Sequence, residues 1–241
     1  MPLIRTVLAL GVFLVLGLLR LIVPLRAIEL LLWTSVLRLF RVQLVVHGQA
    51  AQGGTLLLAN HVSWIDIAAF GRTIDACFVA KAEVGGWPII GAAARRIGCL
   101  FVKRSSRRSA HLIAAQLGER LDAGRNVIVF PEGTTGPGDH VLPFRSTLTG
   151  AVTCQPLQVQ PVAMVYRSVQ DRALAAWLGD ASLLPHALAL ARSGGVTLDL
   201  WFEQPFVATD RKHAAVRAGA VIAARLADEL LDQAATLKRV A

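Results

Sequence analysis

The sequence contains few residues that form disulfides or metal centres. Only three of its 241 residues are cysteines, and they lie on separate apolar stretches without the spacing of metal ligands. Isolated cysteines of this kind are usually reduced core thiols, which fits exposure to the cytosol, where disulfides are rare. We therefore expect no metal site and no disulfide framework.

The motifs of several other protein classes are also absent. A serine hydrolase needs a G-x-S-x-G nucleophile elbow, and a zinc enzyme needs H-E-x-x-H or paired C-x-x-C ligands. The chain contains none of these, and neither a G-x-x-x-x-G-K-[ST] nor a G-x-G-x-x-G phosphate loop. It also has no RNP block, zinc finger or helix-turn-helix signature, so we expect no nucleic-acid partner.

Acidic residues are scarce relative to basic ones. The chain has 16 Asp and Glu against 25 Lys and Arg, which gives a net charge of +9. Residues 95–108 hold six positive charges and no acid within 14 positions. Basic groups that are interleaved with a very apolar sequence favour an anionic bilayer surface over nucleic acid. The charge pattern thus predicts contact with membrane lipids.

The N-terminal part is apolar, but its runs are short. Val7–Leu19 are 13 apolar residues, which as a helix reach roughly 20 Å against a hydrocarbon core of about 30 Å. Pro24 separates this run from a second one at Ala27–Leu37. The pattern predicts a membrane-embedded helical hairpin in one leaflet; a single tilted span, in which Arg20 snorkels, is the alternative. No small-x-small cleavage site follows the run, which disfavours a signal peptide.

From about residue 43 strands and helices alternate, which is typical of an α/β fold with a mainly parallel mixed sheet flanked by helices. We expect two parts: membrane-anchoring helices in residues 1–42 and an α/β domain in residues 43–241. The expected strands are Gln43–His47, Thr55–Ala59, Ala76–Ala80, Cys99–Val102, Asn126–Phe130, Val159–Tyr166 and Val196–Glu203. The expected helices are Ser63–Thr73, Pro88–Ile97, Ser105–Ala123, Arg145–Val152, Ser182–Arg192 and Thr209–Ala235.

One segment joins the end of a buried strand to a histidine and a carboxylate. After an apolar run the sequence reads Asn60-His61-Val62-Ser63-Trp64-Ile65-Asp66. Ser63-x-x-Asp66 resembles a capping box, so we expect a helix to begin at Ser63. His61 then sits just before the helix, where its ring can fold back toward Asp66. That arrangement supplies a general base and the group that fixes its tautomer. The alternative is an ordinary N-cap beside a loop histidine.

This segment resembles the first sequence block of the glycerolipid acyltransferase family, N-H-x-S-x-x-D. The second block pairs a Gly with Phe and Arg, as in Gly98-Cys99-Leu100-Phe101-Val102-Lys103-Arg104. The third, F-P-E-G-T-R-S, resembles Phe130-Pro131-Glu132-Gly133-Thr134-Thr135-Gly136. The fourth is a Pro in a late apolar strand, matched by Pro161. The blocks occur in the family's order, with one departure: Thr135 and Gly136 replace the usual Arg and Ser.

The resemblance implies roles for individual residues. His61 is implied to be the base that takes the proton of the acceptor hydroxyl, and Asp66 the group that orients it and favours the imidazolium. Substrate contacts are implied for Gly98, Phe101, Lys103, Arg104, Glu132, Gly133, Thr134 and Pro161. Arg104 suits an anionic headgroup, because a guanidinium offers two parallel donors. The residues alone leave structural alternatives open: a solvated charge at Arg104, a helix end at Gly98, a plain turn at Glu132-Gly133, and a strand edge or bulge at Pro161.

The resulting prediction is a membrane-bound O-acyltransferase. The resemblance implies acyl transfer from an acyl carrier protein or coenzyme A thioester to 1-acyl-glycerol-3-phosphate, without a cofactor, at the cytoplasmic face of a bacterial inner membrane. With no nucleophile paired by motif with His61, we expect direct transfer without an acyl-enzyme. Thr135 and Leu142–Ser146 also resemble bacterial relatives that acylate lyso-ornithine lipid, the alternative acceptor. A non-enzymatic membrane-surface scaffold is the competing class.

Overall fold

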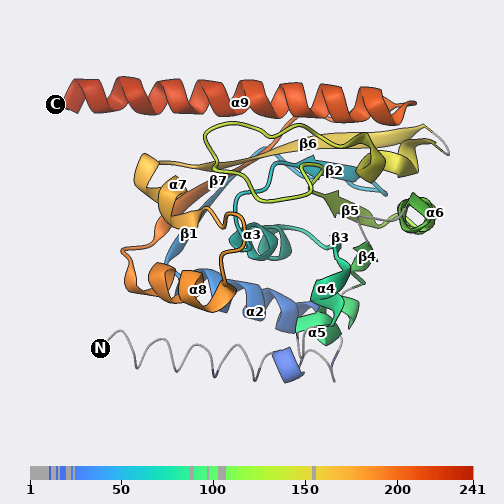
Figure 1. Cartoon of the computed structure of the whole chain (residues 1–241), viewed down its shortest axis with the longest axis horizontal. Helices are drawn as coiled ribbons and strands as arrows, with labels where there is room; N and C mark the ends of the chain where they lie inside the picture. Colours follow the sequence, from blue (N-terminus) through green and yellow to red (C-terminus); the bar gives the residue numbers. More distant parts are fainter. Residues whose placement is uncertain are drawn as a thin grey trace.

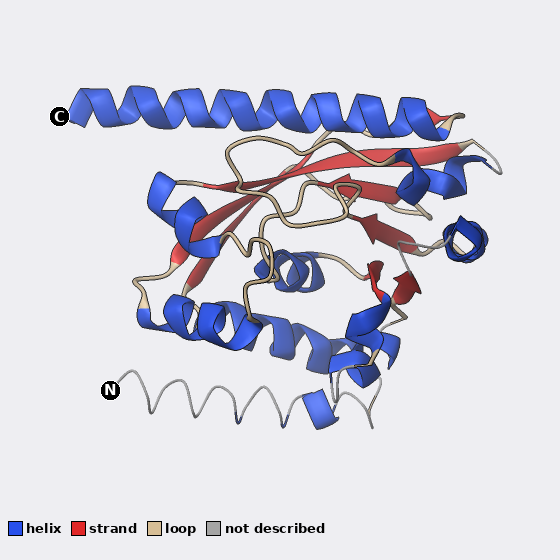
Figure 2. Cartoon of the chain, viewed as in Figure 1, coloured by secondary structure: helices blue, strands red, loops and turns tan. Residues whose placement is uncertain are grey.

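A single sheet with helices on both faces forms the middle of the molecule (Figure 1). The computed structural model describes residues 11, 15, 17–19, 23, 25–86, 90–96, 98–102, 107–153 and 156–240. In Figure 2 the strands lie between α9 on one side and the layer that contains α2, α3 and α8 on the other. This arrangement confirms the predicted α/β fold with a mixed sheet flanked by helices.

The elements follow one another in the expected alternation. The strands are β1 (Val42–His47), β2 (Leu56–Ala59), β3 (Ala76–Lys81), β4 (Leu100–Val102), β5 (Asn126–Val129), β6 (Leu157–Tyr166), β7 (Val196–Phe202) and β8 (Phe206–Ala208). The helices are α2 (Arg26–Leu39), α3 (Ile65–Thr73), α4 (Ala82–Gly85), α5 (Ile90–Arg96), α6 (Arg107–Asp122), the 3₁₀ segment η1 (Ser146–Thr153), α7 (Val169–Ala175), α8 (Leu183–Arg192) and α9 (Arg211–Val240).

The sheet order is β1-β7-β6-β2-β5-β3-β4, and β8 pairs with β6. The run β6-β2-β5-β3-β4 is parallel throughout, as is the pair β1-β7. The two parallel groups meet at the antiparallel pair β6-β7. All four residues of both β2 and β5 are buried, because helices cover both faces of these central strands. The segments that follow β2 and β5 therefore emerge side by side at one edge of the sheet.

Strand β6 separates the two hydrophobic layers. Its residues Val162, Met164 and Tyr166 join the core that contains Phe70 of α3. Ala163 and Val165 point the other way and pack on Ile222 and Leu226 of α9. This alternation follows from the two-residue repeat of a strand, and it places Tyr166 on the same face as α3.

Proline is tolerated in β6 because of a change of neighbour. Residues Leu157–Val159 pair with β8, and Val162–Tyr166 pair with β7. Pro161 lies between these two stretches, and its carbonyl accepts a hydrogen bond from the amide of Glu203. A residue without an N–H fits where the antiparallel ladder is interrupted, so the structure supports the structural reading of Pro161.

Helix α2 packs against the α/β domain. Arg26 donates to the carbonyls of Gly71 and Ile74, at the C-terminal end of α3, at 2.8 and 2.6 Å. Gly71 permits the close packing of Trp33 in α2 on α3, because a Cβ at residue 71 would clash with the indole ring. Leu32, like other inward residues of α2, is buried. The second apolar run of the sequence thus forms a helix that belongs at least in part to the core.

The first arm of the predicted membrane hairpin, Val7–Leu19, lies mostly outside the described residues, whereas the second, Ala27–Leu37, lies within α2. Among the residues that the structure describes, no helix has both the length and the hydropathy needed to cross a bilayer. The hairpin and the domain division at residue 42 therefore stay predictions.

All seven expected strands are present, with ends that shift by one or two residues. Strand β8 and helices α4 and α7 were not expected. The segment expected to be a helix from Arg145 is a 3₁₀ segment with non-helical dihedral angles at Thr149. The helix expected from Ser63 begins at Ile65 instead.

Candidate active site

His61 lies just beyond the carboxyl end of β2, held between the sheet and α3. Its Nδ1 lies 2.8 Å from Oδ2 of Asp66, as the sequence predicts. The imidazole stacks on Phe130, with ring centroids 4.0 Å apart and planes 16° apart. The His61 side chain keeps 16% of its surface exposed, whereas that of Asp66 is fully buried. Because Nδ1 faces the carboxylate, Nε2 is the nitrogen left for a substrate.

Asp66 is surrounded by neutral donors. Its Oδ2 also accepts from the backbone amides of Val62 and Ser63, at 2.8 and 2.9 Å. Its Oδ1 accepts from the hydroxyl of Tyr166 at 2.7 Å. Within the described part of the chain, no Lys or Arg forms an ion pair with Asp66. These donors hold the carboxylate in place without an ion pair to Lys or Arg, so its Oδ2 faces the His61 ring.

The same contacts explain where α3 begins. The sequence predicts a cap by the side chain of Ser63, but Trp64 occupies the N-cap position without a side-chain hydrogen bond. The Asp66 carboxylate reaches back instead to the amides that precede the helix. The Asp66 side chain therefore binds the amides of the loop before the helix, and these bonds fix the loop that carries His61.

Asn60 extends the pairing of β2 and β6 by side-chain contacts. Its Nδ2 donates to the carbonyl of Met164 at 3.0 Å, and its Oδ1 accepts from the Met164 amide at 2.8 Å. These two bonds imitate one further rung of the ladder and keep His61 in register with Tyr166. Sequence reasoning did not single out Asn60 or Tyr166, although Tyr166 is the only tyrosine in the chain.

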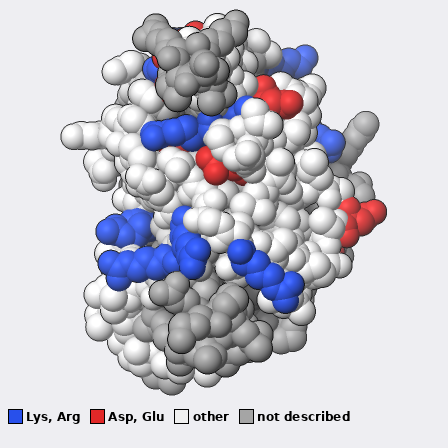
Figure 3. All heavy atoms as spheres, turned by 90° about the vertical axis from the view of Figure 1, so that its left-hand side faces the viewer, with Lys and Arg blue, Asp and Glu red and all other residues white. Residues whose placement is uncertain are grey.

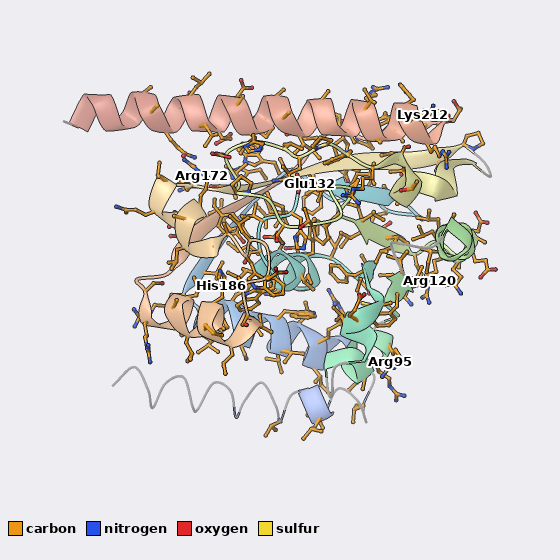
Figure 4. The ribbon with its side chains drawn as sticks, in the orientation of Figure 1. Arg95, Arg120, Glu132, Arg172, His186 and Lys212 are labelled. Atoms are coloured by element: carbon orange, nitrogen blue, oxygen red, sulfur yellow. The ribbon has the colours of Figure 1, made fainter. Side chains whose placement is uncertain are left out.

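Glu132, which is labelled in Figure 4, supports the backbone of His61 through its carboxylate. Its Oε2 accepts from the His61 amide and its Oε1 from the Leu142 amide, both at 3.0 Å. Burial raises the pKa of Glu132 to about 7, against the lowering effect of these two bonds. Both oxygens are thus occupied by main-chain donors, and the geometry assigns Glu132 to positioning.

The loop after Glu132 encloses the His61 segment. The Gly136 amide donates to the carbonyl of His61 at 2.7 Å. Thr135, which replaces the family's usual Arg, donates its hydroxyl to the carbonyl of Trp177. The Trp177 amide in turn donates to the carbonyl of Val62 at 3.0 Å. Thr135 therefore joins two loops that flank the histidine, and its hydroxyl is not free for a substrate.

Gly133 and Thr134 form the outer turn of this loop. The Gly133 amide donates to the carbonyl of Phe130 at 3.1 Å, so it is not a free donor for an anion. Thr134 is exposed. A substrate contact is also predicted for Lys103 and Arg104, but both residues fall outside the described part of the chain.

Gly98 and Phe101 belong to the β4 side of the sheet. Gly98 has a φ of 85° and follows α5, and its amide donates to the carbonyl of Arg95. This left-handed position ends a helix, as the structural alternative expects. Phe101 lies on β4 and packs over Gly85. The contacts of the described residues do not bring either residue to His61.

Helix α8 braces the other flank of the site. The indole of Trp64 donates to Nδ1 of His186 at 3.1 Å, across the interface between α3 and α8 (Figure 4). Burial lowers the pKa of His186, so its ring is held neutral and can accept this bond. Sequence reasoning missed His186, since nothing in its own helix links it to residue 64.

A family model described as Acyltransferase matches residues 43–165, which include His61, Asp66 and Glu132. The chain belongs to the acyltransferase family. The enzyme class and the resemblance drawn from the four blocks are confirmed.

The chain is similar to two curated acyltransferases over matches of different length. It is 38% identical over 172 residues to the lyso-ornithine lipid O-acyltransferase of Rhizobium meliloti (strain 1021), covering 65% of this chain and 59% of that protein. It is 38% identical over 113 residues to the 1-acyl-sn-glycerol-3-phosphate acyltransferase of Neisseria gonorrhoeae, covering 47% of this chain and 44% of that protein. These matches span less than two thirds of either relative.

The acyltransferase also shares its fold with a solved structure. The crystal structure of the 1-acyl-sn-glycerophosphate (LPA) acyltransferase PlsC from Thermotoga maritima superposes with a TM-score of 0.59 at 19% identity, over 95% of this chain and 97% of that chain. At this level of identity the likeness shows the shared fold.

Proposed function

We propose that the protein transfers a fatty acyl group from a thioester to the free hydroxyl of a lysolipid, with His61 as general base. The observation that carries this proposal is the 2.8 Å contact between Nδ1 of His61 and a buried carboxylate with no other cationic partner in the described structure. Such a pair fixes the tautomer and stabilises the imidazolium that forms when the acceptor is deprotonated.

The proposed reaction proceeds in two steps. Nε2 of His61 takes the proton of the acceptor hydroxyl while the oxygen attacks the thioester carbonyl carbon. The tetrahedral intermediate then collapses, the carbon–sulfur bond breaks, and the leaving thiolate takes the proton from Nε2. The products are the acylated lipid and a free thiol, and His61 returns to its neutral state.

Direct transfer is favoured over an acyl-enzyme, because neither Ser63 nor the described cysteines offer an exposed, ionised nucleophile. The side chain of Ser63 is buried without exposed surface, as is that of Cys77. Burial raises the pKa of Cys99 to about 12, so its thiol is protonated at neutral pH. Intact-protein mass spectrometry after mixing with an acyl thioester alone tests this step. We expect an unchanged mass, and a stable acyl adduct would contradict direct transfer.

For the acceptor we propose lyso-ornithine lipid. The sequence alone favours 1-acyl-glycerol-3-phosphate, but the match to the R. meliloti protein, named for lyso-ornithine lipid, extends over 65% of this chain. The position where the family's second guanidinium usually stands is Thr135, whose hydroxyl is engaged by Trp177. A zwitterionic headgroup requires fewer positive partners than a phosphomonoester, so this substitution is consistent with the aminoacyl lipid.

1-Acyl-glycerol-3-phosphate is the second candidate, supported by the N. gonorrhoeae relative named for it. Purified protein assayed with both lysolipids decides between them, and parallel assays with acyl carrier protein and coenzyme A thioesters identify the donor. We expect the ornithine lipid to be the faster acceptor. Preferential formation of phosphatidic acid would reverse the assignment.

We also propose attachment to the cytoplasmic face of a membrane through the N-terminal residues. Basic side chains gather on one face of the molecule (Figure 3). Arg38, Arg41 and Arg192 are exposed at or near the C-terminal ends of α2 and α8, and Arg41 donates to the carbonyl of Ser193. A chain truncated to begin at Leu25 tests the anchor, since truncation at residue 43 would also remove the packed helix α2. We expect the shorter chain to stay folded and lose sedimentation with vesicles; unchanged sedimentation would contradict the anchor.

A further inference from the structure

Arg145 lies across the outer turn of the loop that encloses His61. Its amide donates to the carbonyl of Pro131 at 2.9 Å, which fixes its backbone beside the turn. Its side chain passes over Gly133: a Cβ built there would lie 3.5 Å from Cδ, 3.6 Å from Nε and 3.7 Å from Cζ of Arg145. The guanidinium is therefore held beside the turn that follows Glu132.

The guanidinium of Arg145 has no partner within the described chain. The residue is exposed, and among the described residues neither a carboxylate nor a carbonyl accepts from its side chain. Several described arginines behave differently: Arg167 and Arg225, for example, bind carboxylates at 2.6 Å. An arginine with a fixed backbone, a packed stem and an unused guanidinium is suited to an external anion.

The neighbouring polar groups are already engaged. Both oxygens of Glu132 accept from main-chain amides. The hydroxyl of Thr135 donates to Trp177, and the amide of Gly133 donates to Phe130. Arg145 is therefore the charged group at this rim that remains available, and no described acid neutralises it.

The turn at Gly133 is connected to the proposed base, His61, by two hydrogen bonds to the His61 backbone. Glu132 bonds the amide of His61, and Gly136, three residues beyond Gly133, bonds its carbonyl. A headgroup bound at Gly133 would thus be held at a defined position relative to the His61 ring, which is what acyl transfer to one hydroxyl requires.

We propose that the Arg145 guanidinium binds the oxyanion of the acyl acceptor's headgroup, a carboxylate or a phosphate, and takes the place of the guanidinium that the family has at the position of Thr135. This inference rests on the proposed function. The turn requires glycine at position 133, because at φ 73° a larger residue would be strained, and the arginine stem packs over it at ordinary contact distance. A planar fork matches either oxyanion bidentately, which the single ammonium of lysine does not.

The test compares Arg145→Ala and Arg145→Lys with Arg72→Ala, a control that removes an exposed charge from the far end of α3. We expect Arg145→Ala to raise the KM for the lysolipid about 10- to 100-fold, with little change in kcat and none in the KM for the thioester. Arg145→Lys should recover part of the loss, and Arg72→Ala should match wild type. The aminoacyl lysolipid and the phosphate lysolipid are assayed separately to identify the oxyanion.

Calorimetric binding of each lysolipid without donor separates this inference from the proposed function. Binding that weakens in Arg145→Ala supports the inference even if the wild type transfers no acyl group. An unchanged KM or an unchanged binding constant for both lysolipids in Arg145→Ala would overturn it. So would a wild type that binds neither lipid, in which case the proposed function fails as well.

Discussion

Among the described residues, two histidine contacts with a buried aspartate have the same length but different surroundings. Nδ1 of His61 lies 2.8 Å from Asp66, and Nε2 of His47 lies 2.8 Å from Asp199. Each ring also stacks on an aromatic side chain, Phe130 in one pair and Trp201 in the other. By distance and stacking alone, the two pairs could not be told apart.

The second partner of each carboxylate separates them. Asp199 accepts two bonds from the guanidinium of Arg167, at 2.9 and 2.6 Å, so its charge is already balanced. Asp66 accepts only from two amides and one hydroxyl besides His61. A carboxylate that is paired with arginine stabilises a neighbouring imidazolium less than a carboxylate without such a partner does. Neutral donors around the aspartate therefore distinguish the proposed catalytic pair better than the histidine contact does.

The largest expected effect on activity is the difference between substitutions of the two histidines. His61→Ala should lower acyl transfer by at least about 10⁴-fold, because it removes the proton acceptor. His47→Ala is the matched control and should keep activity near that of wild type. Turnover with a thioester donor is measured for both variants, with circular dichroism as a check on folding. Equal losses in the two variants would show that neither pair is specifically catalytic.

The aspartates give the next effect. Asp66→Asn should lower kcat by about 10³- to 10⁴-fold, because the amide cannot stabilise the imidazolium and can hold the wrong tautomer. Asp199→Asn should instead weaken the contact with Arg167 and reduce thermal stability while kcat is kept. Steady-state kinetics and thermal melts of both variants provide the measurements. A kcat for Asp66→Asn within tenfold of wild type would contradict the role assigned to Asp66.

The contact between His61 and Asp66, the proposed catalytic pair, could be predicted from the sequence because it is local. His61 and Asp66 are five residues apart, and a strand end followed by the first turn of a helix suffices to bring them together. Tyr166 is 100 residues from Asp66, and its contact depends on the register that sets Ala59 beside Val162. No pattern around residue 166 encodes that register.

Other features could be predicted only in part. A substrate contact of Glu132 stays a prediction, and the contacts of its carboxylate with the amides of His61 and Leu142 depend on the folded loop. Helix α7 was missed although Ser168 and Asp171 form a capping box that both side chains complete, a signal that was present in the sequence. Strand β8 has only three residues, too few to show alternation.

A glutamate near each pair extends the comparison to the pH dependence of stability. Near His47 and Trp201, Glu203 forms an ion pair with Arg225 at 2.6 Å. No described cation pairs with Glu132, and burial raises its pKa to about 7. The native state thus binds a proton between about pH 4.5 and 7 that the unfolded state releases. Stability should fall with rising pH across this window by about 3 kcal/mol and level off above it.

Urea unfolding of the wild type and Glu132→Gln between pH 5 and 8 tests this dependence. The variant should be less stable at low pH, since its amide cannot accept from both main-chain donors, and it should lose the slope. Glu203→Gln removes a carboxylate that is paired with arginine and should keep the wild-type slope. If Glu132→Gln also keeps it, the slope has another origin.

Tyr166→Phe gives the smallest effect and addresses the neutral donors directly. The hydroxyl is fully buried, and burial together with the Asp66 charge raises the Tyr166 pKa well above its usual value, so it acts as a donor at every working pH. Its loss should lower kcat about tenfold, the order expected for one hydrogen bond to a charged group. With one donor fewer, Asp66 attracts the imidazolium proton more strongly, so the acidic limb of the pH–rate profile should move to higher pH.

The shift of this limb distinguishes positioning from packing, because a purely structural loss lowers activity without moving it. Trp201→Phe is the matched control in the second region, where it alters the stack on His47 and should leave the limb in place. An unshifted limb in Tyr166→Phe, with kcat near wild type, would mean that the two amides alone suffice to hold Asp66. The difference between the two pairs would then rest only on the arginine beside Asp199.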